Sequence, residues 1–116
     1  MVDAGANLGP LSLHAASAGC KVHAFEMQPK VAGLLDLSVR LNGWTDRVSV
    51  HNNALWTRAG LPVSYEENSK NYGGTAAVIE GISSYEPSGA TTVRVRSQGC
   101  RVHISCRVHI SWIRVL

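Results

Sequence analysis

The first nine residues constrain the fold of this chain more than any other segment. A short apolar stretch leads to Asp3, and Gly5, Asn7 and Gly9 then follow at every second position. This arrangement indicates a strand end that runs into a glycine-spaced turn and then into a helix. We expect the turn to form a cradle for a nucleotide-like cofactor, with the Asp3 carboxylate at the strand tip.

An apolar helix is predicted directly after this turn. Pro10 suits the first turn of a helix, because the N–H group that proline lacks has no intrahelical acceptor there. Gly19 is typical of the residue that follows a helix end. Leu11, Ala15 and Ala18 recur at helical spacing and are expected to form the buried face.

Two further strands and a second helix are predicted before residue 56. Residues 21–26 and 47–51 alternate as strands, and a helix is expected from Pro29 to the Asn42-Gly43 pair. Strands that alternate with helices of this length pair in parallel, with the helices on the faces of the sheet. The predicted fold class is α/β, with a partial Rossmann-like sheet of βαβαβ order. The positions of the second helix at helical spacing are Val31, Leu34, Leu35, Ser38 and Leu41.

The pattern changes after residue 56. Residues 61–65, 76–83 and 91–97 are predicted to be short antiparallel strands, joined by turns of which one is expected at Gly73-Gly74. The first strand has no residues before Met1 to extend it, and the last segment departs from the βα pattern. The sheet is therefore expected to be incomplete at both ends.

The tail, residues 87–116, differs from the rest of the chain in charge. It holds five arginines and no acidic residue, whereas residues 1–86, the predicted cofactor-binding part, hold six basic and eight acidic residues. A basic segment attracts nucleic acid, but the tail has no recognisable binding module, and we expect no nucleic-acid partner. No apolar run approaches the ~18 residues of a membrane span, so no membrane partner is expected either.

The tail also contains a direct repeat of six residues that starts at Cys100 and again at Cys106. With His103 and His109 the repeat spells C-x-x-H-x-x-C-x-x-H, a set of zinc-ligand types. In an extended strand, however, residues three apart point to opposite faces, and ligands this close leave little chain to fold around an ion. A short sequence duplication is therefore favoured over a zinc site.

The remaining cysteine and histidines give no metal pattern. His14, His23 and His51 share no metal-ligand spacing and are expected to be surface or hydrogen-bonded residues. Three cysteines are an odd number in a chain with no secretory signal. This favours a reducing compartment over a disulfide framework, and hence a cytoplasmic location.

A second acidic residue stands at a distance that suits a cofactor site. Glu26 follows Asp3 by 23 residues and ends the next predicted strand. A carboxylate there accepts hydrogen bonds from both hydroxyls of a ribose, each worth about 1.5–3 kcal/mol. Met27 is expected to pack on an adenine face, and Asn52 or Asn53, at the end of the third strand, to bind the adenine amino group.

The turn itself separates two classes of cofactor. Dinucleotide-binding turns carry G-x-G-x-x-G, with glycines for the turn, for close phosphate approach and for helix packing. Here Asn7 replaces the middle glycine and Pro10 stands where the third is expected, so a pyrophosphate fits poorly. The acid-x-Gly-x-Asn-x-Gly pattern is similar to the turn of class I S-adenosylmethionine-dependent methyltransferases. That ligand has no phosphate, and Asp3 would bind its cationic amino group directly or through water.

Four motifs in order resemble the FkbM-type methyltransferases. They are residues 2–9 with Ser12-Leu13, residues 22–29, residues 37–42 with 48–55, and Gly73-Gly74-Thr75, so that the resemblance covers about residues 1–80. The resemblance implies a Rossmann-like sheet, S-adenosyl-L-methionine as the methyl donor, and a hydroxyl group of a sugar or small metabolite as the acceptor. The residues that it implies for donor binding are Asp3, Gly5, Asn7, Gly9, Glu26, Met27 and Asn53.

The chain departs from that family in two places. In the family a proline follows the ribose-binding glutamate directly, whereas here Met27-Gln28 precede Pro29. The downstream Lys-x-Asp-x-Glu-Gly segment, which carries the next central strand and acceptor-side residues, is not found, and no catalytic residue is assigned. Two other interpretations stay open: a non-catalytic truncated remnant of such an enzyme and, less favoured, a fragment of an NAD-linked oxidoreductase.

Overall fold

The computed structural model describes residues 1–56, 59–60, 62–66, 77–79 and 92–99. Its first part is a parallel three-stranded sheet in the order β1-β2-β3, formed by Val2–Ala4, Val22–Phe25 and Val48–His51. Asp3 pairs with Ala24, and Ala24 with Val50, so the three strands are in register across the sheet. The described part of the chain is therefore an α/β structure, as the alternation of strands and helices predicts.

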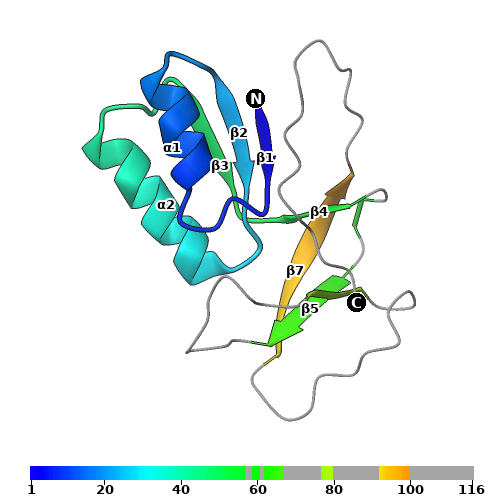
Figure 1. The fold of residues 1–116 in the computed structure, drawn as a ribbon. Coiled ribbons are helices and arrows are strands. Elements are labelled where there is room, and N and C mark those ends of the chain that lie inside the picture. Colours follow the sequence, from blue (N-terminus) through cyan, green and yellow to red (C-terminus); the bar gives the residue numbers. More distant parts are fainter. Residues whose placement is uncertain (57–58, 61, 67–76, 80–91, 100–116) are drawn as a thin grey trace.

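Two helices provide the crossovers between these strands. Helix α1 spans Pro10–Ser17 and helix α2 spans Pro29–Leu41, and both begin with proline at the first helical position, as predicted. Glycines with positive φ follow them, Gly19 at 87° and Gly43 at 68°. Because both crossovers run in the same direction, both helices lie on one face of the sheet (Figure 1).

The core lies between this sheet face and the two helices. The inward positions of the strands are small or β-branched, which lets the helices pack closely against the sheet. Arg47, which directly precedes β3, also connects the sheet to α1. Its guanidinium donates a 3.0 Å hydrogen bond to the carbonyl of Ala16 near the end of α1. The buried residues of the core cluster are Ala6, Ala16, Val22, Ala24, Leu35, Val39 and Val48.

The buried face of α1 differs from the prediction. Ser12 and Ala16 face the sheet, whereas Leu11 is 44% exposed and Ala18 is also exposed. The reason is that the preceding turn sets the rotation of the helix, with the Leu13 N–H bonded to the Gly9 carbonyl, and Ser12 is held by a buried polar partner. In a short helix rich in alanine, apolar spacing alone gives too little contrast to fix that rotation.

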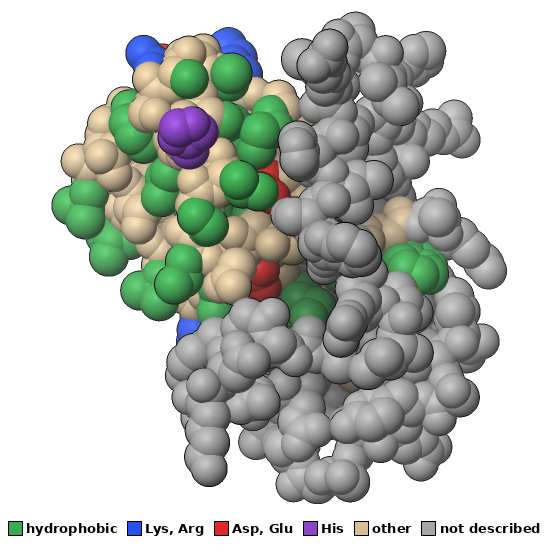
Figure 2. Space-filling view, in the orientation of Figure 1, with side chains coloured by type: hydrophobic (Ala, Val, Ile, Leu, Met, Phe, Trp, Pro, Cys, Tyr) green, Lys and Arg blue, Asp and Glu red, His purple; other side chains and the backbone are tan. Residues whose placement is uncertain are grey.

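The predicted face of α2 is correct only in part. Val31 and Leu35 are buried as expected and are joined by Ala32 and Val39, but Leu34 is 52% exposed. The buried row follows the i, i+4 and i+8 positions 31, 35 and 39, so the true face is rotated away from the predicted one. The exposed large apolar residues, which lie on the helices and the turn before α1, are Leu8, Leu11, Leu34, Leu37 and Leu41. Figure 2 shows hydrophobic side chains scattered over this side of the molecule.

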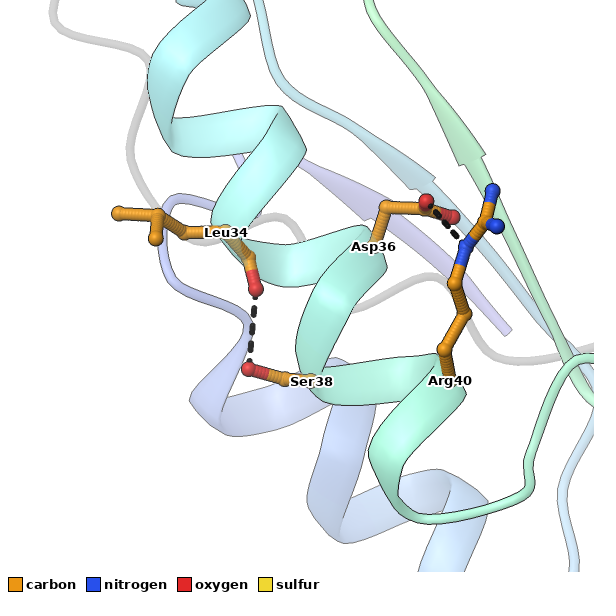
Figure 3. Close-up of polar contacts among 4 residues, drawn as sticks. All are labelled: Leu34, Asp36, Ser38 and Arg40. Carbon is orange, nitrogen blue, oxygen red and sulfur yellow. Dashed lines mark hydrogen bonds and ion pairs between the residues drawn. The ribbon is translucent and has the colours of Figure 1, made fainter.

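The outward face of α2 also carries local polar contacts (Figure 3). Arg40 donates a 2.7 Å hydrogen bond from Nε to Asp36 Oδ2. The Arg40 side chain is 69% exposed and the Asp36 side chain 43%. An exposed pair at this spacing contributes about 0.3–0.5 kcal/mol. Ser38 Oγ donates to the carbonyl of Leu34 at 3.0 Å, a bond within the helix. These contacts favour the helix but do not fix its packing.

A second sheet follows, in the order β4-β7-β5-β6. Its strands are Ala54–Trp56, Pro62–Glu66, Ala77–Ile79 and Thr92–Gly99 in chain order. The predicted antiparallel pairing is confirmed for β5 with β6 and β5 with β7. Strand β7 also pairs in parallel with β4, a strand that the sequence did not indicate. Pairing of segments about 40 residues apart leaves no local sequence signal.

Several predictions fall outside the described residues. They concern the Gly73-Gly74 turn and the repeat with Cys100, His103, Cys106 and His109. Within the described residues, no helix has the length and apolar character needed to cross a membrane.

Candidate functional site

The predicted site residues gather at one edge of the parallel sheet. Strands β1, β2 and β3 end at Ala4, Phe25 and His51, and parallel strands bring their carboxyl ends to the same edge. Residues 5–9, 26–28 and 52–53 follow these ends directly. In open α/β sheets, ligands bind in the crevice outside the carboxyl ends of the strands.

The turn between β1 and α1 has left-handed backbone at alternate positions. The φ angles of Gly5, Asn7 and Gly9 are 76°, 53° and 84°. Glycine adopts such angles without strain, and asparagine is among the few other residues that do so. Asn7 therefore occupies a position of the same backbone class as the two glycines. The glycine-spaced turn predicted from the sequence is present.

The N–H groups of this turn point back into the protein. Gly5 and Ala6 both donate to the Phe25 carbonyl at 2.9 Å, and Gly9 donates to the Ala6 carbonyl at 2.8 Å. Asn7 donates to Glu26 Oε2 at 2.9 Å. A phosphate cradle presents free N–H groups to the ligand. Four of the five N–H groups in residues 5–9 have acceptors within the chain, so the turn is poorly suited to bind a pyrophosphate.

Glu26 joins the turn to the end of β2. Its side chain is only 4% exposed, and its second oxygen, Oε1, accepts a 2.8 Å hydrogen bond from the N–H of Gln28. Each carboxylate oxygen thus accepts one backbone N–H, which satisfies the buried charge. Each oxygen has a second lone pair. These lone pairs are the acceptors that a ribose hydroxyl would use once neighbouring groups move aside.

Asp3 lies beneath the first turn of α1 and is 1% exposed. Its Oδ2 accepts a 2.6 Å hydrogen bond from the hydroxyl of Ser12, which is itself fully buried. Sequence reasoning did not assign Ser12 a partner, although a hydroxyl in the third helical position beside an acidic strand end is a usable signal. Asp3 therefore ties β1 to α1, while Glu26 ties β2 to the turn.

We expect Ser12→Ala to lower the free energy of unfolding by about 1.5–3 kcal/mol, because it leaves the buried Asp3 carboxylate without its hydroxyl donor. Ser17→Ala is the matched control. The Ser17 hydroxyl also makes a hydrogen bond, 2.7 Å to the His14 carbonyl, but it is exposed, and its loss should change stability by less than about 0.5 kcal/mol. Urea denaturation of the two variants and the parent measures both values. Equal losses would contradict the role given to Ser12.

Asn7 offers an acceptor without a partner. Its side-chain oxygen Oδ1 is buried and has no hydrogen-bond donor among the residues that the structure describes. Buried polar atoms are nearly always hydrogen-bonded, and an exception calls for an explanation. A donor supplied by a bound molecule at this turn is one such explanation, and it fits the predicted role of Asn7.

The other predicted adenine contacts have mixed positions. Asn52 is used by the fold, because its Nδ2 donates to the Glu26 carbonyl at 2.9 Å and to the Met27 carbonyl at 3.1 Å. It fastens the end of β2 to the end of β3. Met27 and Asn53 are half-buried at the same edge, and the Asn53 N–H donates to the His51 carbonyl at 2.9 Å. Their contact with adenine stays a prediction.

Comparison of the chain with known protein families, with curated proteins and with solved structures found no match. Within the described ranges, no group of three or more histidine, cysteine, aspartate or glutamate side chains is arranged to hold a metal ion. The function is therefore inferred from the residues of the site itself.

Proposed function

We propose that residues 1–86 form the donor-binding part of an S-adenosylmethionine-dependent methyltransferase of the FkbM type, with a Rossmann-like arrangement of its parallel sheet. The strand order β1-β2-β3 with both helices on one face is compatible with one half of a doubly wound sheet. The resemblance implies acidic residues on two neighbouring strands, and they are Glu26, directly after β2, and Asp3, which lies within β1 and is buried beneath α1.

The observation that carries the proposal is the hydrogen bonding between Glu26 and the turn. A buried carboxylate is held against Asn7, and four of the five N–H groups of the turn are bonded to protein acceptors. The arrangement is rich in acceptors for a ligand and poor in donors. Ribose hydroxyls and an amino group donate hydrogen bonds, whereas a phosphate accepts them and therefore needs hydrogen-bond donors from the protein. A nucleoside ligand without phosphate at this turn suits that chemistry.

Different residues of the site would bind different parts of the methyl donor, S-adenosylmethionine. Glu26 would accept hydrogen bonds from the ribose hydroxyls, and Asn7 Oδ1 would accept one from the ligand. The contact of Asp3 with the cationic amino group, directly or through water, would require neighbouring groups to move aside, because Asp3 is 1% exposed. Half-buried Met27 would pack against the adenine and Asn53 would bind its amino group. These residues bind and orient the donor; none of them is assigned as a general base.

When bound, S-adenosylmethionine would supply an activated methyl group that a hydroxyl oxygen takes up by direct displacement, with the sulfur leaving as a neutral thioether and the hydroxyl proton passing to water. The acceptor class that the resemblance implies is a hydroxyl of a sugar or small metabolite. The chain's contribution to the rate would be the alignment of donor and acceptor and the exclusion of water.

Calorimetry with S-adenosylhomocysteine and with NAD, each added to the full chain, tests the proposal. We expect saturable binding of S-adenosylhomocysteine and none of NAD. Binding of NAD alone would support the oxidoreductase interpretation instead, and binding of neither would support a non-binding remnant. Incubation with labelled S-adenosylmethionine and a panel of sugars then separates a working enzyme from a chain that only binds the donor.

A further inference from the structure

Two histidines far apart in the sequence meet on the sheet face opposite the helices. His23 lies on β2 and His51 at the end of β3, and the register pairs His23 with Ser49 and Phe25 with His51. All four residues therefore point to the same face, since alternate residues of a strand do. The two histidines share no metal-ligand spacing in the sequence, because only the parallel register brings them together.

The two rings approach each other through nitrogen atoms. His23 Nδ1 and His51 Nε2 are 3.2 Å apart, and the ring centroids are 5.5 Å apart with planes at 25°. The His51 ring also stacks on Phe25, with centroids 4.6 Å apart and planes at 16°. Phe25 thus holds one imidazole in place, while the His23 side chain is exposed and has room to turn.

We propose that His23 Nδ1 and His51 Nε2 form a two-nitrogen chelate for a late first-row divalent transition ion, with Cu²⁺ bound most tightly. Imidazole nitrogen binds copper, nickel and zinc, and copper gives the most stable complexes in this series. The two imidazoles lie on the sheet face opposite Asp3, which faces helix α1. The His51 backbone adjoins the proposed donor site, because its carbonyl accepts from the N–H groups of Glu26 and Asn53 at 3.0 and 2.9 Å.

The spacing of the two nitrogens fits such an ion. With metal–nitrogen bonds of about 2.1 Å, two ligand nitrogens about 3.2 Å apart subtend an angle of about 100° at the metal, between the square-planar and tetrahedral values. The ion would lie beside the line that joins the nitrogens, so the rings must turn toward it, and exposed His23 is the freer of the two to do so. Water completes the coordination.

Burial, and secondly the neighbouring His23, lower the pKa of His51 below its usual value. The chelate is inferred from the distance between the two nitrogens and from the sheet face that the two side chains share.

The test uses Cu²⁺ added to the full chain, in a background that removes other strong ligands. That background carries C20S, C100S, H103Q, C106S and H109Q. We expect one site at which electron spin echo modulation detects two imidazoles. His23→Gln and His51→Gln should each leave one imidazole and weaken binding on the order of 100-fold, because the chelate is lost. His14→Gln, at an exposed histidine on α1, is the matched control and should change neither value.

Thermal unfolding adds a second readout, because an ion that bridges two strands binds only the folded chain. Cu²⁺ should raise the midpoint of the background protein and leave that of His23→Gln unchanged. His23 is exposed, so this variant is expected to fold even if the His51 variant does not. A two-imidazole signal that persists in His23→Gln, or the same affinity in His23→Gln as in His14→Gln, would overturn the proposal.

Discussion

Replacement of Glu26 by glutamine is expected to lower both the stability of the chain and its affinity for S-adenosylhomocysteine. Glutamine keeps the size of the side chain but has one acceptor oxygen in place of two. One of the N–H groups of Asn7 and Gln28, which now bond to the carboxylate at 2.9 and 2.8 Å, would face an amide NH₂. Loss of a charged hydrogen bond and an unsatisfied buried donor together cost about 2–4 kcal/mol.

The effect on binding follows from the same atoms. A carboxylate accepts hydrogen bonds from both ribose hydroxyls. The glutamine amide accepts one with its oxygen, and its NH₂ group would face the other hydroxyl, which is also a donor. We expect the affinity for S-adenosylhomocysteine to fall about 10-fold or more, which is about 1.4 kcal/mol or more. Urea denaturation gives the stability change, and calorimetry under conditions in which the variant is folded gives the affinity.

Asp36→Asn is the matched control for this substitution. It makes the same change from carboxylate to amide on the exposed face of α2, where Asp36 accepts a 2.7 Å hydrogen bond from Arg40. Its stability should change by less than about 0.5 kcal/mol, and its binding should not change. If Glu26→Gln is destabilised but binds S-adenosylhomocysteine as tightly as the parent, Glu26 holds the turn and does not hold a ribose. The ribose assignment would then be wrong.

The parts of the fold that the sequence predicted are those with local signals. Proline at the first position of each helix, glycine after each helix end and alternation in the strands all act within a few residues. They placed the helices at Pro10–Ser17 and Pro29–Leu41 and the first three strands within one or two residues of their observed ends. The left-handed turn was also predictable, because few residue types adopt positive φ.

The parts that were missed depend on contacts between distant segments. The rotation of α1 follows from the bond between Ser12 and Asp3, nine residues apart, and leaves Leu11 and Ala18 exposed despite their apolar spacing. The pairing of β4 with β7 joins segments about 40 residues apart. In the candidate site, the sequence identified Glu26 as a ligand contact, but not the two backbone N–H groups that hold it. These partners are set by how the turn lies against β2.

The second large effect on stability is expected at Gly9, in the turn between β1 and α1. A Cβ atom on Gly9 would lie about 2.1 Å from Leu35 Cδ1 and 3.2 Å from Leu35 Cγ, and the Gly9 φ is 84°. Leu35 is fully buried, so its side chain would have to shift within the core. We expect Gly9→Ala to lower the free energy of unfolding by about 2–5 kcal/mol, the sum of left-handed strain and overpacking.

Gly5→Ala separates the two causes of that loss. Gly5 has nearly the same backbone conformation, with φ at 76°, but its Cβ would meet nothing within 4 Å among the described residues. It should lose only the strain, about 1–2 kcal/mol. The double variant Gly9→Ala/Leu35→Ala should then lose less than the sum of the two single losses, because each change makes room for the other. Equal losses at Gly5 and Gly9 in urea denaturation would mean that the turn does not lie against α2. The site built on that contact would then lose its support, because Asn7 is positioned against Glu26 by the same turn.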